Sequence, residues 1–243
     1  MSQALGSARR VAFFGGSFDP PHLGHVAVAQ AARKALALDT VLFAPVGTQP
    51  LKPAGSTASF EDRVAMTRLA IGGEPGFEIS LVDAPKPSGG ANYTLDTLRS
   101  LRLELPEDCT LYCLMGADSL AGLRLWHGAA EIPFVAPLIV ASRPGQPLDD
   151  LMALLPPELT IEQSTDANLP ESDVEVRAYS LVNPAGQRAA FYLLPGLNVE
   201  ISASRIRELA RASSETGEVS QAADHKLLAD AVLVYIRSHG LYR

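Results

Sequence analysis

The sequence has no long apolar run, few cysteines and no excess of positive charge. Its longest uncharged stretches are short and interrupted by glycine or proline, so none approaches the ~20 apolar residues that span a bilayer. The pair Arg9-Arg10 is followed by only a short apolar run, which is not the apolar core of a signal peptide. We therefore expect a cytoplasmic protein that does not bind membranes.

The two cysteines, Cys109 and Cys113, lie beside and within a strand-like apolar run. Their C-x-x-x-C spacing, without neighbouring histidines, indicates neither a disulfide framework nor a zinc site. Buried, reduced thiols are the predicted state.

The charge balance is acidic, with 20 lysines and arginines against 27 aspartates and glutamates, a formal net charge of −7. A general nucleic-acid binder carries a basic face, so this class of protein is disfavoured. A polyanionic ligand must then be met by local positive charge.

With 243 residues and 47% apolar content, the chain suffices for one large α/β domain or two small ones. We predict a single domain over residues 1–243, without internal repeats. Its apolar runs typical of buried strands cover residues 11–14, 40–46, 77–82, 110–115, 137–141 and 189–194. Helical patterns between the first five cover residues 23–36, 59–71, 94–105 and 118–132. The alternation predicts a Rossmann-like, doubly wound α/β fold, with a mostly parallel sheet and helices on both faces.

Residues 145–196 are rich in proline and contain an acidic stretch, so we predict a variable excursion from the sheet. It should contain a short helix near 149–155 and a hairpin around 183–186. A C-terminal helical element then covers 201–243. Its first helix should run from 205 to about 212 with Ser202 or Ser204 as its cap, and its last from 222 to 239, ending at Gly240.

Residues 15–25, GGSFDPPHLGH, lie between a predicted strand and a predicted helix. The glycines allow a polyphosphate to approach the main chain, and free N–H groups at a helix start attract anions. His22 and His25 add directed donors beside that position. Two histidines three residues apart can also share a metal ion, but no third ligand lies nearby in the sequence, and we predict no metal ligands in the protein.

The same stretch resembles the signature of nucleotidyltransferases that join a nucleoside triphosphate to a phosphorylated acceptor. The matching residues are Gly16, Phe18, Asp19, Pro20, His22, Gly24 and His25. Residues 201–207, ISASRIR, resemble the element that closes the active site in the same superfamily. The likeness indicates Ser204 and Arg207 as phosphate contacts, whereas Arg205 is interpreted as a solvated helix charge.

Three further segments are similar to motifs of bacterial nicotinate-nucleotide adenylyltransferases. They are residues 91–98, residues 116–145 with Gly116, Asp118 and Trp126, and the ending 235–242, YIRSHGLY. Trp126 is the only tryptophan of the chain, and without these motifs core filling would be its ordinary interpretation.

The resemblance implies a set of site residues. Asp118 would hold the ATP ribose and Trp126 would stack on the pyridine ring of the acceptor. The implied catalytic residues are His22, His25 and Arg207. Implied ATP contacts are Gly15, Gly16, Ser17, Phe18, Gly24, His25, Gly116, Asp118, Arg143, Ile201, Ser202, Ser204 and Arg207. Implied acceptor contacts are Lys52, Tyr93, Thr94, Trp126 and His127. Asp19 is interpreted as structural, capping the turn.

The chain departs from the family pattern at three positions. Leu51 stands where relatives carry a histidine, so only Lys52 is carried over from that motif. Asn92 replaces a serine and His127 a tyrosine. Roles that need those exact side chains are not carried over.

The implied reaction is attack by the 5′-phosphate of nicotinate mononucleotide on the α-phosphorus of ATP, with Mg²⁺ carried by the nucleotide. The alternatives are another phosphorylated acceptor, such as nicotinamide mononucleotide or phosphopantetheine, and a nucleotide-sensing module without turnover. The sequence indicates no oligomeric state.

Overall fold

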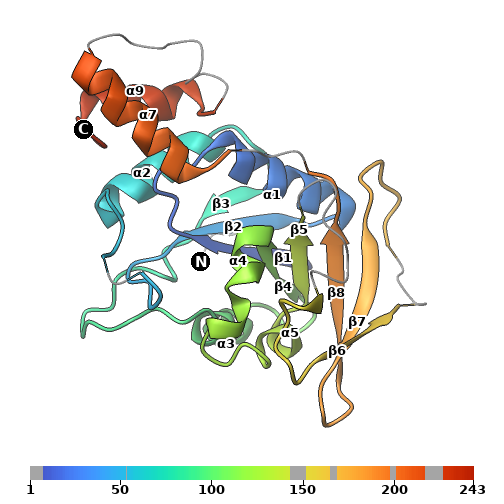
Figure 1. Cartoon of the computed structure of the whole chain (residues 1–243). Helices are drawn as coiled ribbons and strands as arrows, with labels where there is room; N and C mark the ends of the chain where they lie inside the picture. Colours follow the sequence, from blue (N-terminus) through green and yellow to red (C-terminus); the bar gives the residue numbers. More distant parts are fainter. Residues whose placement is uncertain (1–7, 53, 143–151, 165–168, 198–200, 217–226) are drawn as a thin grey trace. The chain divides into compact units, whose positions relative to one another are not determined.

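The computed structural model describes residues 8–52, 54–142, 152–164, 169–197, 201–216 and 227–243. It contains an eight-stranded sheet in the order β3-β2-β1-β4-β5-β8-β7-β6 (Figure 1). The strands are β1 (Arg10–Gly16), β2 (Thr40–Pro45), β3 (Phe77–Ile79), β4 (Thr110–Gly116), β5 (Leu138–Ala141), β6 (Thr160–Gln163), β7 (Arg177–Val182) and β8 (Arg188–Leu194). The helices are α1 (Leu23–Ala35), α2 (Phe60–Ile71), α3 (Thr94–Glu104), α4 (Ala117–Ala121), the 3₁₀ turn η1 (Leu123–Leu125), α5 (Ile132–Val135), α7 (Ala203–Thr216) and α9 (Asp230–Ser238).

The chain divides into two compact units. The first contains Met1–Gly15, Val28–Leu42 and Tyr93–Asn198, and the second contains Gly16–Ala27, Phe43–Asn92 and Val199–Arg243. The single domain expected from the sequence stays a prediction, and each unit is described by itself below.

In the first unit, β1, β4, β5 and β8 pair in parallel, while β8, β7 and β6 pair antiparallel. The strands β1, β4 and β5 are almost fully buried, as strands covered on both faces must be. Helix α1 and the pair α3 and α5 cover opposite sides of the sheet (Figure 1). The strand order reverses between β1 and β4, and ligands of doubly wound sheets bind beyond the carboxyl ends of strands at such a switch point. The predicted fold class is confirmed.

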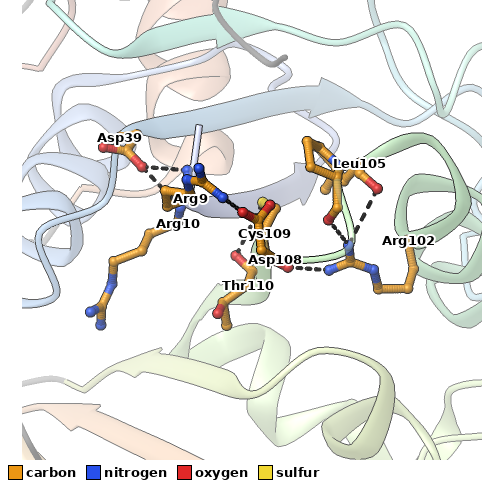
Figure 2. A network of polar contacts seen from close by, with 9 residues as sticks. Arg9, Arg10, Asp39, Arg102, Leu105, Asp108, Cys109 and Thr110 are labelled. Atoms are coloured by element: carbon orange, nitrogen blue, oxygen red, sulfur yellow. Dashed lines mark hydrogen bonds and ion pairs between the residues drawn. The ribbon is translucent and has the colours of Figure 1, made fainter. Parts of the chain in front are cut away.

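A polar network holds the other edge of this sheet, where β1 and β4 begin (Figure 2). Asp39 Oδ2 accepts the main-chain N–H groups of Arg9 at 2.7 Å and Arg10 at 2.9 Å. Arg9 also pairs with Asp108, and the Arg102 guanidinium donates to the main-chain oxygens of residues 105, 106 and 109. These contacts fix the starts of β1 and β4 and therefore their register. Cys109 and Cys113 are buried thiols, as predicted.

Four predicted elements differ from the structure. Residues 118–132 form α4, η1 and the first residue of α5 instead of one helix, since Gly122 and Gly128, the latter at φ +61°, interrupt the pattern. The third strand ends at Ile79, because the Ala84 N–H donates to the Leu81 oxygen and closes a turn. Of the predicted helix near 149–155, residues 149–151 lie outside the described residues, Met152 is helical, and the chain turns from residue 153 onward. The last predicted helix begins at Asp230, while residues 222–226 lie outside the described residues.

The hairpin predicted around 183–186 is confirmed. It joins β7 to β8, and Asn183 Oδ1 accepts the N–H groups of Ala185 and Gln187. Strand β6, which the sequence did not indicate, pairs with β7.

In the second unit, α2 begins at its cap Ser59, whose Oγ accepts the Asp62 N–H at 3.0 Å. Helices α2, α7 and α9 share an apolar cluster whose buried members are Ala58, Met66, Ile206, Leu228, Val232, Leu233, Ile236 and Tyr242. Two segments of the unit that are far apart in the sequence thus contribute to one core. Among the described residues no helix is long and apolar enough to cross a membrane, and the cytoplasmic location stays a prediction.

Candidate functional site

The two histidines of the signature lie at the start of α1, as predicted. His22 precedes the helix and His25 is in its first turn. Their rings stack with centroids 3.7 Å apart. The main-chain N–H of His22 donates to Nδ1 of the His25 ring at 3.1 Å. Because Nδ1 of a neutral His25 accepts a hydrogen bond, its proton is on Nε2. His25 is therefore arranged to act as a donor through Nε2.

Both imidazoles are uncharged near neutral pH. Burial lowers the pKa of His22 from 6.5 to about 4, and burial, with a smaller contribution from neighbouring His22, lowers the pKa of His25 well below its ordinary value. His22 is 7% exposed, and its Nδ1 makes no hydrogen bond to the described residues. The pair thus offers directed donors rather than fixed positive charge.

The lowered pKa of His22 predicts a pH-dependent stability. Unfolded His22 binds a proton below pH 6.5, whereas the folded residue does so only near pH 4. Its contribution is therefore fully present above pH 6.5 and is lost as the pH falls toward 4, by up to about 3 kcal/mol. We expect His22→Gln to remove this loss. Urea unfolding of both proteins at about pH 7 and about pH 4.5 measures it, and equal pH dependences would contradict the assignment.

The main chain at this helix start differs from the expectation of free N–H groups. The Leu23 N–H donates to the Leu227 oxygen at 2.9 Å, and the His25 N–H donates to the His22 oxygen at 2.9 Å. Packing of the C-terminal segment uses one group, and the tight turn uses the other. These two main-chain N–H groups are therefore already used within the protein, and the directed donors that remain at this helix start include the side chains of the two histidines.

Asp19 lies at the centre of the second unit's polar contacts. Its carboxylate is 5% exposed and accepts the N–H groups of Thr57 at 2.6 Å and Ala58 at 3.1 Å. The Tyr242 hydroxyl donates to the same carboxylate at 2.8 Å. These donors tie the signature loop to the start of α2 and to the C-terminus, which supports the structural interpretation of Asp19.

Arg207 of α7 contacts the same loop. Its Nη1 donates to the Asp19 main-chain oxygen at 2.7 Å, and Nη2 donates to Ser204 Oγ at 3.2 Å. Of the two predicted caps, Ser202 fills the position, since its Oγ accepts the Arg205 N–H at 3.2 Å. Arg205 is exposed and pairs with Glu208 at 3.4 Å, as expected for a solvated helix charge. The partly buried Ile201 packs on the apolar cluster.

Two further cationic side chains, those of Lys52 and Arg63, donate hydrogen bonds to Ser17 of the signature loop. Lys52 Nζ donates to Ser17 Oγ at 3.0 Å, and Arg63 Nη1 donates to the Ser17 main-chain oxygen at 2.7 Å. Leu51, the departure from the family pattern, is 50% exposed.

Sequence reasoning missed Arg63. It is 2% exposed on the buried face of α2, and burial lowers its pKa while the nearby Asp19 carboxylate opposes that shift. An arginine among the apolar positions of α2 was the available signal.

Two glycines of the signature, Gly15 and Gly16, lie close to aromatic rings in the free protein. A Cβ on Gly15 would lie 2.7 Å from the Phe13 ring, and one on Gly16 would lie 3.2 Å from the Phe18 ring. Phe18 is buried at φ +47°, and its ring lies edge-on to His25 at 4.9 Å. Gly24 is buried in the first turn of α1. Close ring packing is therefore an additional reason for glycine at positions 15 and 16.

The first unit holds the remaining predicted residues. Gly116 ends β4, with open space where a Cβ would stand, and Asp118 is exposed in α4. Thr94 begins α3, and the Tyr93 and His127 rings lie 4.8 Å apart. Arg143 lies outside the described residues.

Trp126 follows η1 and is partly exposed. Its main-chain N–H donates to the main-chain oxygen of Leu123 at 2.9 Å. After His127, the chain turns at Gly128, where φ is +61° and a Cβ would meet Leu95 at 2.3 Å. The turn fixes the path of Trp126 and His127 against α3. Among the described residues no group of three His, Cys, Asp or Glu side chains is placed to hold a metal ion.

Comparison with known proteins identifies the class. Residues 13–209 match the family model described as Cytidylyltransferase-like. The chain belongs to this family of nucleotidyltransferases. It is 40% identical over 236 residues to a probable nicotinate-nucleotide adenylyltransferase of Laribacter hongkongensis, covering 96% of this chain and 94% of the relative. A protein of the same name from Gloeobacter violaceus is 37% identical, with 96% of each chain covered.

Within that family, the chain is a member of the nicotinate-nucleotide adenylyltransferases, as its sequence indicated. The fold has a counterpart in the Plasmodium falciparum nicotinic acid mononucleotide adenylyltransferase complexed with NaAD. That structure superposes with a TM-score of 0.67 at 17% identity, covering 96% of this chain and 97% of the other.

Proposed function

We propose that the chain transfers the adenylyl group of ATP to the 5′-phosphate of nicotinate mononucleotide, producing nicotinate adenine dinucleotide and pyrophosphate in NAD biosynthesis. The names of its relatives support this activity. The observation that carries it is the set of donors gathered on one loop of the second unit. His22, His25, Lys52 and Arg207 all lie on or contact residues 17–25.

The reaction needs positioning and charge stabilisation rather than a covalent intermediate. An oxygen of the acceptor phosphate attacks the α-phosphorus, and the bond to the β-phosphate oxygen breaks. The acceptor phosphate is already ionised at neutral pH, so no base must remove a proton. His25 would donate through Nε2 to the α-phosphate, where charge changes in the transition state.

Cations would hold the leaving pyrophosphate. Arg207 offers planar N–H donors suited to phosphate oxygens, with Ser204 beside it. Lys52, held at Ser17, would supply a point charge to the phosphate of the acceptor. Magnesium enters as part of the MgATP substrate, held by phosphate and water oxygens, and neutralises part of the phosphate charge. The remaining expected ATP contacts of this unit are Gly16, Ser17, Phe18, Gly24, Ile201 and Ser202.

Residues of the first unit would bind the rest of the substrates. Asp118 would accept the ribose hydroxyls, and the open space at Gly116 would allow close approach of the nucleotide. Gly15 and Arg143 complete the proposed ATP contacts. Trp126 would stack on the pyridine ring, with Tyr93, Thr94 and His127 as further acceptor contacts.

A panel of acceptors tests the proposal. ATP and Mg²⁺ are supplied with nicotinate mononucleotide, nicotinamide mononucleotide or phosphopantetheine, and pyrophosphate release gives kcat/KM for each. The proposal predicts turnover that requires an acceptor and is fastest with nicotinate mononucleotide. A higher kcat/KM with either other acceptor would refute the substrate, and ATP binding without turnover would indicate a sensing module.

Metal removal gives a further prediction. Excess chelator should abolish turnover, and Mg²⁺ should restore it without zinc, because the triphosphate supplies the oxygen ligands that Mg²⁺ prefers. Metal analysis accompanies the assay. Stoichiometric zinc that is lost together with activity would contradict this expectation.

A further inference from the structure

The end of the chain, residues 235–242, carries two tyrosines that bind two different aspartates. The Leu241 N–H donates to the Ile236 oxygen, and Gly240 adopts φ +61°, so the chain turns back beyond α9. This turn places Tyr242 in the apolar cluster, where it is 5% exposed. Its hydroxyl meets Asp19, which precedes it by 223 residues in the sequence.

We propose that Tyr242 is a positioning residue for adenylyl transfer, and that its hydroxyl acts by orienting Asp19 and, through the Asp19 main chain, Arg207. The inference rests on the proposed function and assigns a role to the C-terminal motif. Tyr242 itself would touch neither substrate.

The contacts of Asp19 explain how the effect would be transmitted. Its Oδ1 accepts from Tyr242 and from the Ala58 N–H, while Oδ2 accepts from the Thr57 N–H. Its main-chain oxygen accepts from Arg207 Nη1. One residue therefore joins the C-terminus to the guanidinium, and a change in its orientation moves the acceptor that Arg207 uses.

The loop depends on such contacts because its backbone is not relaxed. Phe18, immediately before Asp19, has φ +47°, a conformation that costs a bulky L-residue free energy unless its surroundings hold it. Tyr242 is a dependable donor, since burial and the adjacent Asp19 carboxylate raise its pKa far above neutrality. The hydroxyl keeps its proton throughout the pH range of an assay.

Tyr235 provides a matched control. Its hydroxyl donates to Asp62 Oδ1 at 2.9 Å, close to the 2.8 Å of Tyr242 to Asp19. It lies on the same C-terminal segment and in the same unit. Its partner Asp62 is in the first turn of α2 and outside the signature loop. Tyr235→Phe therefore removes a bond of the same kind without disturbing Asp19.

The test compares Tyr242→Phe with Tyr235→Phe by two-substrate kinetics and urea unfolding. Tyr242→Phe should lower kcat about tenfold, the effect of losing one hydrogen bond to a charged group, with KM for ATP changed less than about twofold. Tyr235→Phe should leave kcat unchanged. Replacing Tyr242 with 4-aminophenylalanine, which retains a donor at the same place, should recover most of the lost kcat. If Tyr242→Phe does not fold, the 4-aminophenylalanine protein is compared with the wild type instead. Its amino group is a weaker donor than the hydroxyl, so its kcat should be lower than that of the wild type.

A double-mutant cycle tests the route through Arg207. In an Arg207→Lys background, Tyr242→Phe should cost less than about threefold in kcat, because the guanidinium that Asp19 positions is gone. Equal kcat for Tyr242→Phe and Tyr235→Phe, or full additivity with Arg207→Lys, would overturn the positioning role. A wild-type protein that makes no dinucleotide would instead refute the proposed function, and this role with it.

Discussion

Replacing His25 with alanine should lower kcat by roughly 10²–10³-fold while the protein remains folded. In the proposed reaction, the Nε2–H of His25 donates to the α-phosphate, and donors aimed at transition-state charge contribute about 3–4 kcal/mol. The measurement is steady-state kinetics with ATP and nicotinate mononucleotide on purified, folded variant. More than about a tenth of the wild-type kcat in the variant would contradict the assigned role.

Two further variants separate the chemistry from the packing. Alanine also removes the Nδ1 acceptor of the His22 N–H, which by itself destabilises the loop. His25→Asn retains an acceptor near that atom but lacks the distant Nε2 donor, so it should be as inactive as alanine. His239→Ala is the control, because this exposed imidazole stacks on Tyr235 at 3.9 Å and lies outside the signature. It should retain full activity.

Replacing Trp126 with alanine should raise KM for nicotinate mononucleotide roughly 5- to 150-fold. Loss of a ring stacked on an indole costs on the order of 1–3 kcal/mol, by analogy with bases stacked on aromatic side chains. KM for ATP should hardly change, since none of the proposed ATP contacts is the indole. Two-substrate kinetics and thermal melting of the same variant measure both quantities.

The competing interpretation of Trp126 as a core residue predicts a different outcome. It requires a loss of several kcal/mol in stability, with both substrates affected together. Trp126 is partly exposed while nearby Leu123 and Ile132 are fully buried, which argues against a core role, and stacking on the acceptor stays a prediction. Leu125→Ala is the control, since Leu125 adjoins Trp126 and is 72% exposed. A large drop in melting temperature with parallel rises in both KM values would reject the stacking role.

The elements that carry the signature were predictable because their signals are local. Glycines after an apolar run, followed by proline and an amphipathic pattern, specify a strand, a turn and a helix within residues 10–35. The same locality placed both histidines at the helix start. The cap at Ser202 and the glycine beyond α9 follow from chemistry within a few residues.

The contacts around Asp19 could not be predicted in the same way. Its partner Tyr242 is 223 residues away and Arg207 is 188 residues away, and no periodicity specifies such pairs. The identity of Asp19 suggested a turn cap, but not which N–H groups it would accept. The prediction for residues 118–132 failed for another reason: their apolar spacing is helical, but Gly122 and Gly128 interrupt it.

The central claim is that this chain joins ATP to nicotinate mononucleotide, and phosphorus NMR of one reaction mixture tests it most directly. The sample contains the enzyme, both nucleotides and Mg²⁺. The account predicts that the monophosphate resonance of nicotinate mononucleotide falls together with those of ATP, while dinucleotide diphosphate and pyrophosphate grow in equal amounts. ATP resonances that stay unchanged, or that convert to ADP and inorganic phosphate while the monophosphate persists, would contradict it.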